Sequence, residues 1–167
     1  MALMSGDAVS NTTAILALGN AGNLNILKDI YSNIYIPEAV ANEIKSVNIP
    51  SWINILKIQS HESYNVLTNT HGLHPGEAEA IILADELCRV KNIKALLLDE
   101  GQARKHVKFY FKSQQYPQIH PLPMILKIAE KKGLVTDFRQ EIKNYDKNGY
   151  YKLTADDKIR YFRNSTP

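Results

Sequence analysis

The order of apolar and polar positions along the chain predicts strands and helices in alternation. Residues 93–98 form an almost unbroken apolar run, which is typical of a strand buried on both faces of a parallel sheet. The stretch from Glu77 onward begins with acidic residues and then turns apolar, and Glu77, Ile81 and Ala84 share one helical face. We therefore expect an amphipathic helix followed by a central strand.

The rest of the pattern gives shorter elements of both kinds. Candidate strands cover residues 8–10, 33–36, 53–58 and 119–120, and candidate helices cover residues 14–18, 24–30, 38–45, 62–70, 77–90, 101–111, 121–132, 136–145 and 156–162. Gly133 stands where a helix C-cap glycine is favoured. This alternation predicts the α/β class, as a three-layer α/β/α domain with a mostly parallel central sheet.

Length and composition narrow the class of protein. The chain has 167 residues, 44% of them hydrophobic and 22% charged, which predicts one globular domain over residues 1–167. We expect residues 1–6 to be frayed and residues 146–167 to form a C-terminal extension with a terminal helix. The lone Cys88 excludes a disulfide framework, and no stretch has the length of a membrane span, so we expect a cytoplasmic protein with no membrane partner.

Charge and histidine spacing give weaker information. The net charge of +3 permits binding to a polyanion without requiring it. The five histidines show no metal-ligand spacing, and Lys131 and Lys132 are expected on a solvated helix face. Aromatic and basic residues mix near the C-terminus, between Tyr150 and Arg163. Such a mixture suits either RNA stacking or packing of a terminal helix on the domain.

Two acidic positions carry the first functional hypothesis. Asp99 directly follows the apolar strand, and Glu77 lies in the first turn of the amphipathic helix. In open α/β sheets the ligand crevice lies outside the carboxyl ends of the strands, so these carboxylates are placed for a metal site. Each also has a purely structural explanation, since Asp99 could cap the next helix and Glu77 could complement the helix dipole.

Four blocks of the sequence resemble the PIN-domain family, most of all its subgroup of small prokaryotic predicted nucleic-acid-binding proteins. The blocks are Val9-Ser10-Asn11-Thr12-Thr13, residues 37–44, residues 76–84, and Leu97-Leu98-Asp99-Glu100 with Ala103-Arg104. Residues 127–134 also resemble the helix that follows in this subgroup. The blocks occur in the order of the family and together span about nine tenths of the chain.

The resemblance implies an activity and a site. PIN domains are metal-dependent endoribonucleases, many of them the toxins of toxin–antitoxin pairs. Carried over to this sequence, the catalytic carboxylates would be Glu43, Glu77 and Asp99, and Asn11 stands where most relatives have an aspartate. These four residues would bind Mg²⁺ or Mn²⁺, more weakly than four carboxylates because an amide adds no charge. The implied partners are RNA, a cognate antitoxin and a second copy of the chain.

Residues beside these four are candidates for contacts around the metal or with substrate: Thr12, Thr13, Glu79, Glu100 and Arg104. Each has an alternative role. The threonines could cap the following helix, and Glu79 faces another side of its helix. Arg104 could simply pair with Glu100 at the i,i+4 spacing. Glu43 could likewise be an exposed acid at the end of a helix.

Asn11 also motivates a rival function. If the metal pocket lacks charge, the chain could be a catalytically weak or inactive PIN domain that binds RNA or another protein without cutting. A receiver-like signalling domain is disfavoured, because it would need an acidic pair after the first strand, where this chain has Ser10-Asn11-Thr12.

Overall fold

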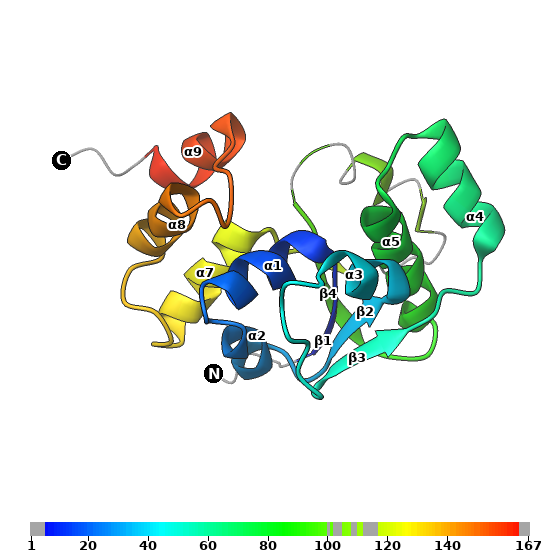
Figure 1. The fold of residues 1–167 in the computed structure, drawn as a ribbon, viewed down its shortest axis with the longest axis horizontal. Helices are drawn as coiled ribbons and strands as arrows, with labels where there is room; N and C mark the ends of the chain where they lie inside the picture. The colour runs from blue at the N-terminus through cyan, green and yellow to red at the C-terminus, as the bar shows by residue number, and fades with distance from the viewer. Residues whose placement is uncertain (1–5, 100, 102–104, 108–109, 112–116, 164–167) are drawn as a thin grey trace.

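The computed structural model describes residues 6–99, 101, 105–107, 110–111 and 117–163. Within this part of the chain one parallel sheet has the strand order β3-β2-β1-β4-β5 (Figure 1). The strands are β1 (Asp7–Ser10), β2 (Ile34–Pro37), β3 (Ile53–Leu56), β4 (Ile93–Leu97) and β5 (Gln118–Ile119). The sequence prediction of a three-layer α/β/α fold with a mostly parallel sheet is confirmed.

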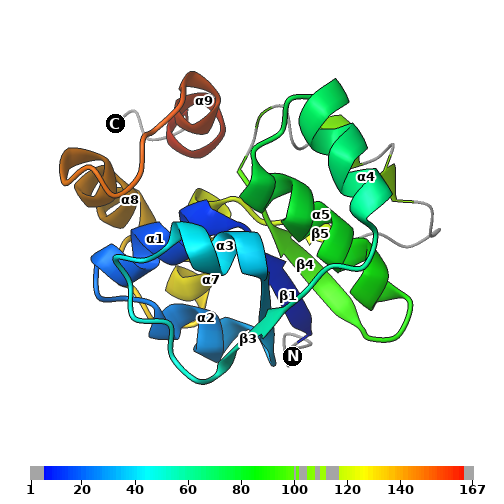
Figure 2. The same cartoon turned by 45° about the vertical axis from the view of Figure 1, so that its right-hand side comes forward.

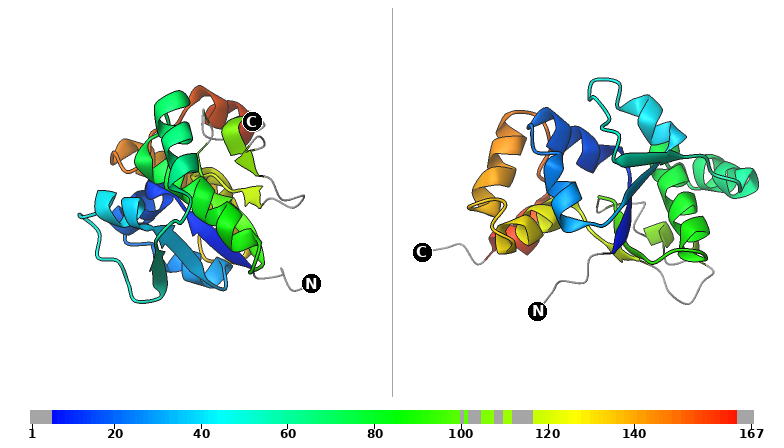
Figure 3. Two further views of the ribbon diagram at one scale, coloured as in Figure 1. Left: turned by 90° about the vertical axis from the view of Figure 1, so that its right-hand side faces the viewer. Right: turned by 90° about the horizontal axis from the view of Figure 1, so that it is seen from below.

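Helices cover both faces of the sheet (Figures 1 and 3). One face carries α1 (Thr12–Asn20), α2 (Asn25–Ile30), α7 (Leu122–Lys131) and α8 (Phe138–Lys147). The other carries α4 (His61–Asn65), the π-helix η1 (Val66–Thr70) and α5 (Pro75–Cys88). The short α3 (Glu38–Glu43) directly follows β2 and packs against α5, as Figure 2 shows.

The alternation of side chains along the strands divides the core into two halves. Ala8 on β1 pairs with Ile34 and Ala95, and all three are buried in the cluster with α1, α2 and α7. The next residue, Val9, pairs with Tyr35 and lies in the other cluster with α5. Because successive strand residues point to opposite faces, every central strand contributes to both halves.

Two helix boundaries differ from the sequence prediction, and a side-chain cap decides one of them. Helix α1 begins at Thr12, two residues earlier than expected. Helix α8 begins at Phe138, two residues later than expected, because the Asp137 carboxylate accepts hydrogen bonds from the backbone N–H groups of Arg139 (3.0 Å) and Gln140 (3.2 Å). After α7, Gly133 has the positive φ of 74° that a left-handed cap requires, as predicted.

The predicted helix 101–111 lies partly outside the described residues, and residues 105–107 and 110 are helical. No helix in the described ranges is long and apolar enough to cross a membrane.

The aromatic residues near the C-terminus pack on the domain. Tyr161 of α9 (Ala155–Phe162) is 9% exposed and meets Phe138 of α8 edge-on. Thr154 and Asp157 form a capping box at the start of α9, and the Tyr151 hydroxyl donates to Asp157 (2.7 Å). These tyrosines therefore serve the fold, as the packing alternative expected.

The strand order fixes where a ligand crevice should lie. From β1 the chain moves outward through β2 to β3, and then crosses back to place β4 on the other side of β1. The strand order thus reverses between β1 and β4. Open α/β sheets bind ligands outside the carboxyl ends of the strands at this switch point. Asn11 and Asp99 come just after these two strands.

Candidate active site

Asn11 is a polar residue that is buried at this edge. It is 2% exposed, and its backbone N–H donates to the Leu97 carbonyl at 3.0 Å, which ties the end of β1 to the end of β4. Its side chain makes no capping bond to α1, and its Oδ1 atom has no hydrogen-bond partner in the described part of the chain. A buried amide oxygen without a partner costs stability, so its position calls for a ligand that it can bind.

Glu43 lies at the last residue of α3 and is held by two groups from other elements. The Thr12 hydroxyl donates to Oε2, and the Gly76 backbone N–H donates to Oε1 at 3.0 Å. Gly76 belongs to the first turn of α5, where free N–H groups favour an anion. The carboxylate of Glu43 therefore joins α1, α3 and α5 at one point, although its side chain borders solvent.

Glycine at position 76 leaves room for this junction. A Cβ atom there would lie 2.8 and 2.9 Å from the two Glu43 carboxylate oxygens and 2.9 Å from the Thr12 hydroxyl. Atoms do not approach a Cβ so closely, so any side chain would push Glu43 or Thr12 aside. The absence of a side chain lets the backbone reach the carboxylate.

Glu79 has a structural task one turn further along α5. Its Oε2 atom accepts the backbone N–H of Ala39 at 2.9 Å, which satisfies one of the free N–H groups at the start of α3. The bond fastens α3 to α5 and so helps to position Glu43. Thr13, the other threonine of the block, is half-buried in the first turn of α1.

Glu77 and Asp99 border the same edge. Glu77 is half-buried in the first turn of α5, next to the Gly76 amide that holds Glu43. Asp99 is half-buried and follows the fully buried end of β4. Glu100 and Arg104 lie outside the described residues.

The described side chains are not gathered into a finished metal site. Among the residues with described positions, no three aspartate, glutamate, histidine or cysteine side chains lie close enough to hold one metal ion. The donor types nevertheless suit a hard divalent cation, since carboxylate and amide oxygens are the ligands that Mg²⁺ and Mn²⁺ prefer. The buried Oδ1 atom of Asn11 fits such an ion, because a cation would supply the partner that it lacks.

The fold is an open α/β/α domain with oxygen donors at the carboxyl edge of its sheet, beside the switch point where such folds bind ligands. A family model described as DUF3368, a PIN domain, matches residues 7–155. The chain therefore belongs to the PIN-domain family. Members are generally nucleases and typically use divalent metal ions such as Mg²⁺. Comparison with curated proteins and with solved structures gives no match.

The sequence did not reveal how the acidic residues are held. The Gly76 amide and the Thr12 hydroxyl both bind Glu43, a residue more than thirty positions away from each. One signal was present: glycine follows Pro75 at the start of a long helix, where a residue with better helix propensity would be expected. A glycine there indicates a close approach of the backbone to another group.

Proposed function

We propose that this PIN domain is a metal-dependent endoribonuclease that hydrolyses RNA phosphodiester bonds, the toxin of a toxin–antitoxin pair. Its metal ligands are Asn11, Glu43, Glu77 and Asp99, and the three carboxylates are the catalytic residues. The observation that supports this best is the buried, unpartnered Oδ1 atom of Asn11 at the switch point. Membership of a family of nucleases supports the reaction class.

A divalent ion would supply Lewis acidity, lowering the pKa of water and neutralising phosphate charge. The chain's own residues prepare the place for it. Thr12 and Gly76 donate to Glu43, and the two hydrogen bonds limit the rotation of its carboxylate. The second lone pair of each carboxylate oxygen remains for a metal or a water molecule. Water would attack phosphorus in line as the bond to the 3′ oxygen breaks, leaving a 5′-phosphate and a 3′-hydroxyl.

The proposed partners follow from the same function. RNA is the substrate, a cognate antitoxin would restrain a cytoplasmic toxin, and a second copy of the chain would complete a homodimer. A net charge of +3 is compatible with a polyanionic substrate.

The test is cleavage of a mixed single-stranded RNA pool with Mg²⁺ or Mn²⁺, compared with EDTA. Asp99→Asn keeps the shape of the side chain and removes its charge, so we expect cleavage to fall by about a hundredfold or more. Asp156→Asn is the matched control, because Asp156 is exposed on α9 and should cut like the wild type. Cleavage that persists in EDTA, or that Asp99→Asn leaves intact, would contradict the proposal.

A second candidate is an RNA-binding PIN domain without cleavage activity. Two observations favour it: the amide at position 11 brings no charge, and the described carboxylates are not grouped around a point. This candidate predicts RNA affinity that is equal in Mg²⁺ and in EDTA, with no cleavage by wild type or by Asn11→Asp. If Asn11→Asp alone cuts, the fold is competent and the amide limits the natural chain.

A further inference from the structure

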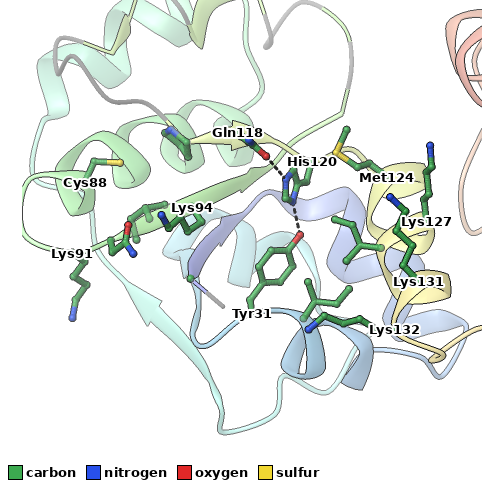
Figure 4. A pocket seen from close by; sticks show the side chains of 16 residues that line it. Tyr31, Cys88, Lys91, Lys94, Gln118, His120, Met124, Lys127, Lys131 and Lys132 are labelled. Atoms are coloured by element: carbon green, nitrogen blue, oxygen red, sulfur yellow. Dashed lines mark hydrogen bonds between the residues drawn. The ribbon is translucent and has the colours of Figure 1, made fainter. Parts of the chain in front are cut away.

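A second concave site lies at the opposite edge of the sheet, where the strands begin. It is a cavity of about 890 Å³, shown in Figure 4. Its walls come from Gly6 before β1, Tyr31 before β2, residues 91–94 at the start of β4, and the helix α7. Pockets that hold small molecules have volumes of roughly 300–1,000 Å³, so this one is large enough for an organic ligand.

The charges around this cavity are of one sign. Lys94 lies on the β4 wall, and Lys127, Lys131 and Lys132 line the α7 wall opposite (Figure 4). No aspartate or glutamate is among the lining residues within the described part of the chain. Lys91 also borders the cavity, but it points away from Tyr31 and its ammonium lies 5.7 Å from the centre of the Tyr35 ring.

Cations on two facing walls reinforce one another's field inside a concavity with low-dielectric sides. Such a field attracts a ligand with several negative charges. Lys132 illustrates the geometry: its side chain extends towards Tyr31, and its ammonium donates to the Asp29 carbonyl at 3.2 Å. An ammonium has two further donors for an incoming anion.

An uncharged, ordered surface lies between the two basic walls. The Tyr31 hydroxyl and His120 Nδ1 are 2.7 Å apart, and His120 Nε2 and Gln118 Oε1 are 3.3 Å apart. Burial lowers the pKa of His120 and raises the pKa of Tyr31, so both are neutral at pH 7. With its proton on Nε2, the imidazole accepts from Tyr31 and donates to Gln118, which fixes the ring in place. Met124 and Ile128 add apolar area beside it.

The lining offers no catalytic machinery of its own. Burial and the neighbouring Asp85 raise the pKa of the Cys88 thiol to about 11, so it stays protonated at neutral pH. The features on hand are charge, concavity and a rigid apolar surface, which are the features of a binding site.

We propose that this cavity binds a small organic polyphosphate, of the nucleoside diphosphate or triphosphate class. Its phosphates would lie between Lys94 and the lysines of α7, and its base and sugar over Met124, Ile128 and the ring of His120. The site is separate from the candidate active site, because the two lie at opposite ends of the same parallel strands. It therefore does not depend on the proposed nuclease function.

A compact ligand fits this place better than an RNA strand. The lysines that border this hollow come from two of its walls, β4 and α7. A strand-binding surface typically extends along the backbone of several nucleotides and adds exposed aromatic rings for stacking. Tyr31, the one tyrosine in the described lining, is only 5% exposed.

The experiment measures binding of ATP to the full-length chain by calorimetry in EDTA, so that no metal at the other edge can recruit its phosphates. Tripolyphosphate tests the contribution of the phosphates to binding, and adenosine tests that of the base and sugar. We expect saturable ATP binding, weaker binding of tripolyphosphate and little of adenosine. The double variant Lys94→Ala/Lys127→Ala should weaken ATP binding about tenfold or more, since each lost charge-assisted bond matters at this scale.

The matched control is Lys147→Ala, which removes the same charge from an exposed position of α8 and should leave ATP affinity unchanged. Thermal unfolding of each variant by circular dichroism shows that the fold is kept. Failure of ATP to bind the wild type would overturn the proposal, as would an equal loss in Lys147→Ala. It would also be overturned if a short RNA displaced ATP at lower concentration and lost the same affinity in the double variant, because the cavity would then belong to an RNA path.

Discussion

The two edges of the sheet differ in the chemistry they present. The carboxyl edge gathers oxygen acceptors, from Asn11 after β1 to Glu43 after β2 and Asp99 after β4. The amino edge gathers ammonium groups, with Lys94 at the start of β4 facing the lysines of α7. In a parallel sheet all strands begin at one edge and end at the other. A polar residue directly before or after a strand therefore lies at the edge where that strand begins or ends.

The strongest test of this comparison removes a charge from the carboxyl edge and measures ligand binding at both edges. Glu43→Gln keeps the shape that Thr12 and Gly76 hold and removes the negative charge. We expect Mn²⁺ affinity, measured by calorimetry, to fall by roughly 10- to 100-fold, and ATP binding at the amino edge to stay unchanged.

The control for Glu43→Gln is Glu38→Gln, an exposed acid in the first turn of the same helix. Unaltered Mn²⁺ affinity in Glu43→Gln would remove Glu43 from the ligand set. Altered ATP binding would show that the two edges are coupled.

Gly76→Ala tests the close approach at the carboxyl edge. The added methyl group would meet both Glu43 oxygens and the Thr12 hydroxyl, so we expect the free energy of unfolding to fall by about 1–3 kcal/mol. Glu43→Ala removes the atoms in the way, so the double variant should be less destabilised than the sum of the single variants. Urea denaturation of the four proteins measures this coupling. Strict additivity would mean that the methyl group is accommodated elsewhere.

Asn11→Asp sharpens the contrast by adding charge where the amide now lies. A buried carboxylate without a cation is costly, so we expect a lower melting temperature in EDTA. Mn²⁺ should bind about tenfold more tightly than to the wild type and restore the melting temperature. Thermal scans with and without Mn²⁺ check both effects. A variant that Mn²⁺ fails to stabilise would place position 11 outside the metal site.

His120→Gln gives the smallest expected effect and concerns the amino edge. Burial lowers the pKa of His120 in the folded state, so below about pH 6.5 the unfolded chain binds a proton that the folded chain resists. This contribution to stability is present at neutral pH and is lost as the pH falls through the range below 6.5. We expect the wild type to lose more stability than His120→Gln between pH 8 and pH 5, by thermal unfolding. The exposed His61, changed to glutamine, is the control; an equal loss in all three proteins would contradict the assignment.

The sequence predicted those features that depend on local pattern. The apolar run at residues 93–98 identified β4, which lies inside the sheet, and its neighbours in the alternation identified the layers. Asn11 and Asp99 could be assigned to one edge because each directly follows a strand. Assigning them to that edge requires only that the strands be parallel, and the alternation of strands and helices predicts parallel strands.

Other features depend on contacts between distant residues. Nothing near Glu79 in the sequence indicates that it accepts the Ala39 amide forty positions earlier. Lys131 is exposed and Lys132 half-buried, in keeping with the solvated helix face expected for them, but the sequence did not show that both line a cavity whose other wall is β4. The cavity forms because α7 packs beside the beginnings of the strands. The residues of its walls are far apart in the sequence, so the local pattern does not predict it.

Gly76 has a consequence for how this sequence can vary under selection. Its amide recognises Glu43 without using a side chain, and a side chain added at position 76 would have to push Glu43 or Thr12 aside. A saturation library selected for folding alone should favour glycine at position 76 and admit many residues at position 77. On the proposal that Glu77 is a metal ligand, the same library selected for RNA cleavage should become restricted at position 77 as well. The difference between the two selections would show which of these two neighbouring residues is required for folding and which for catalysis.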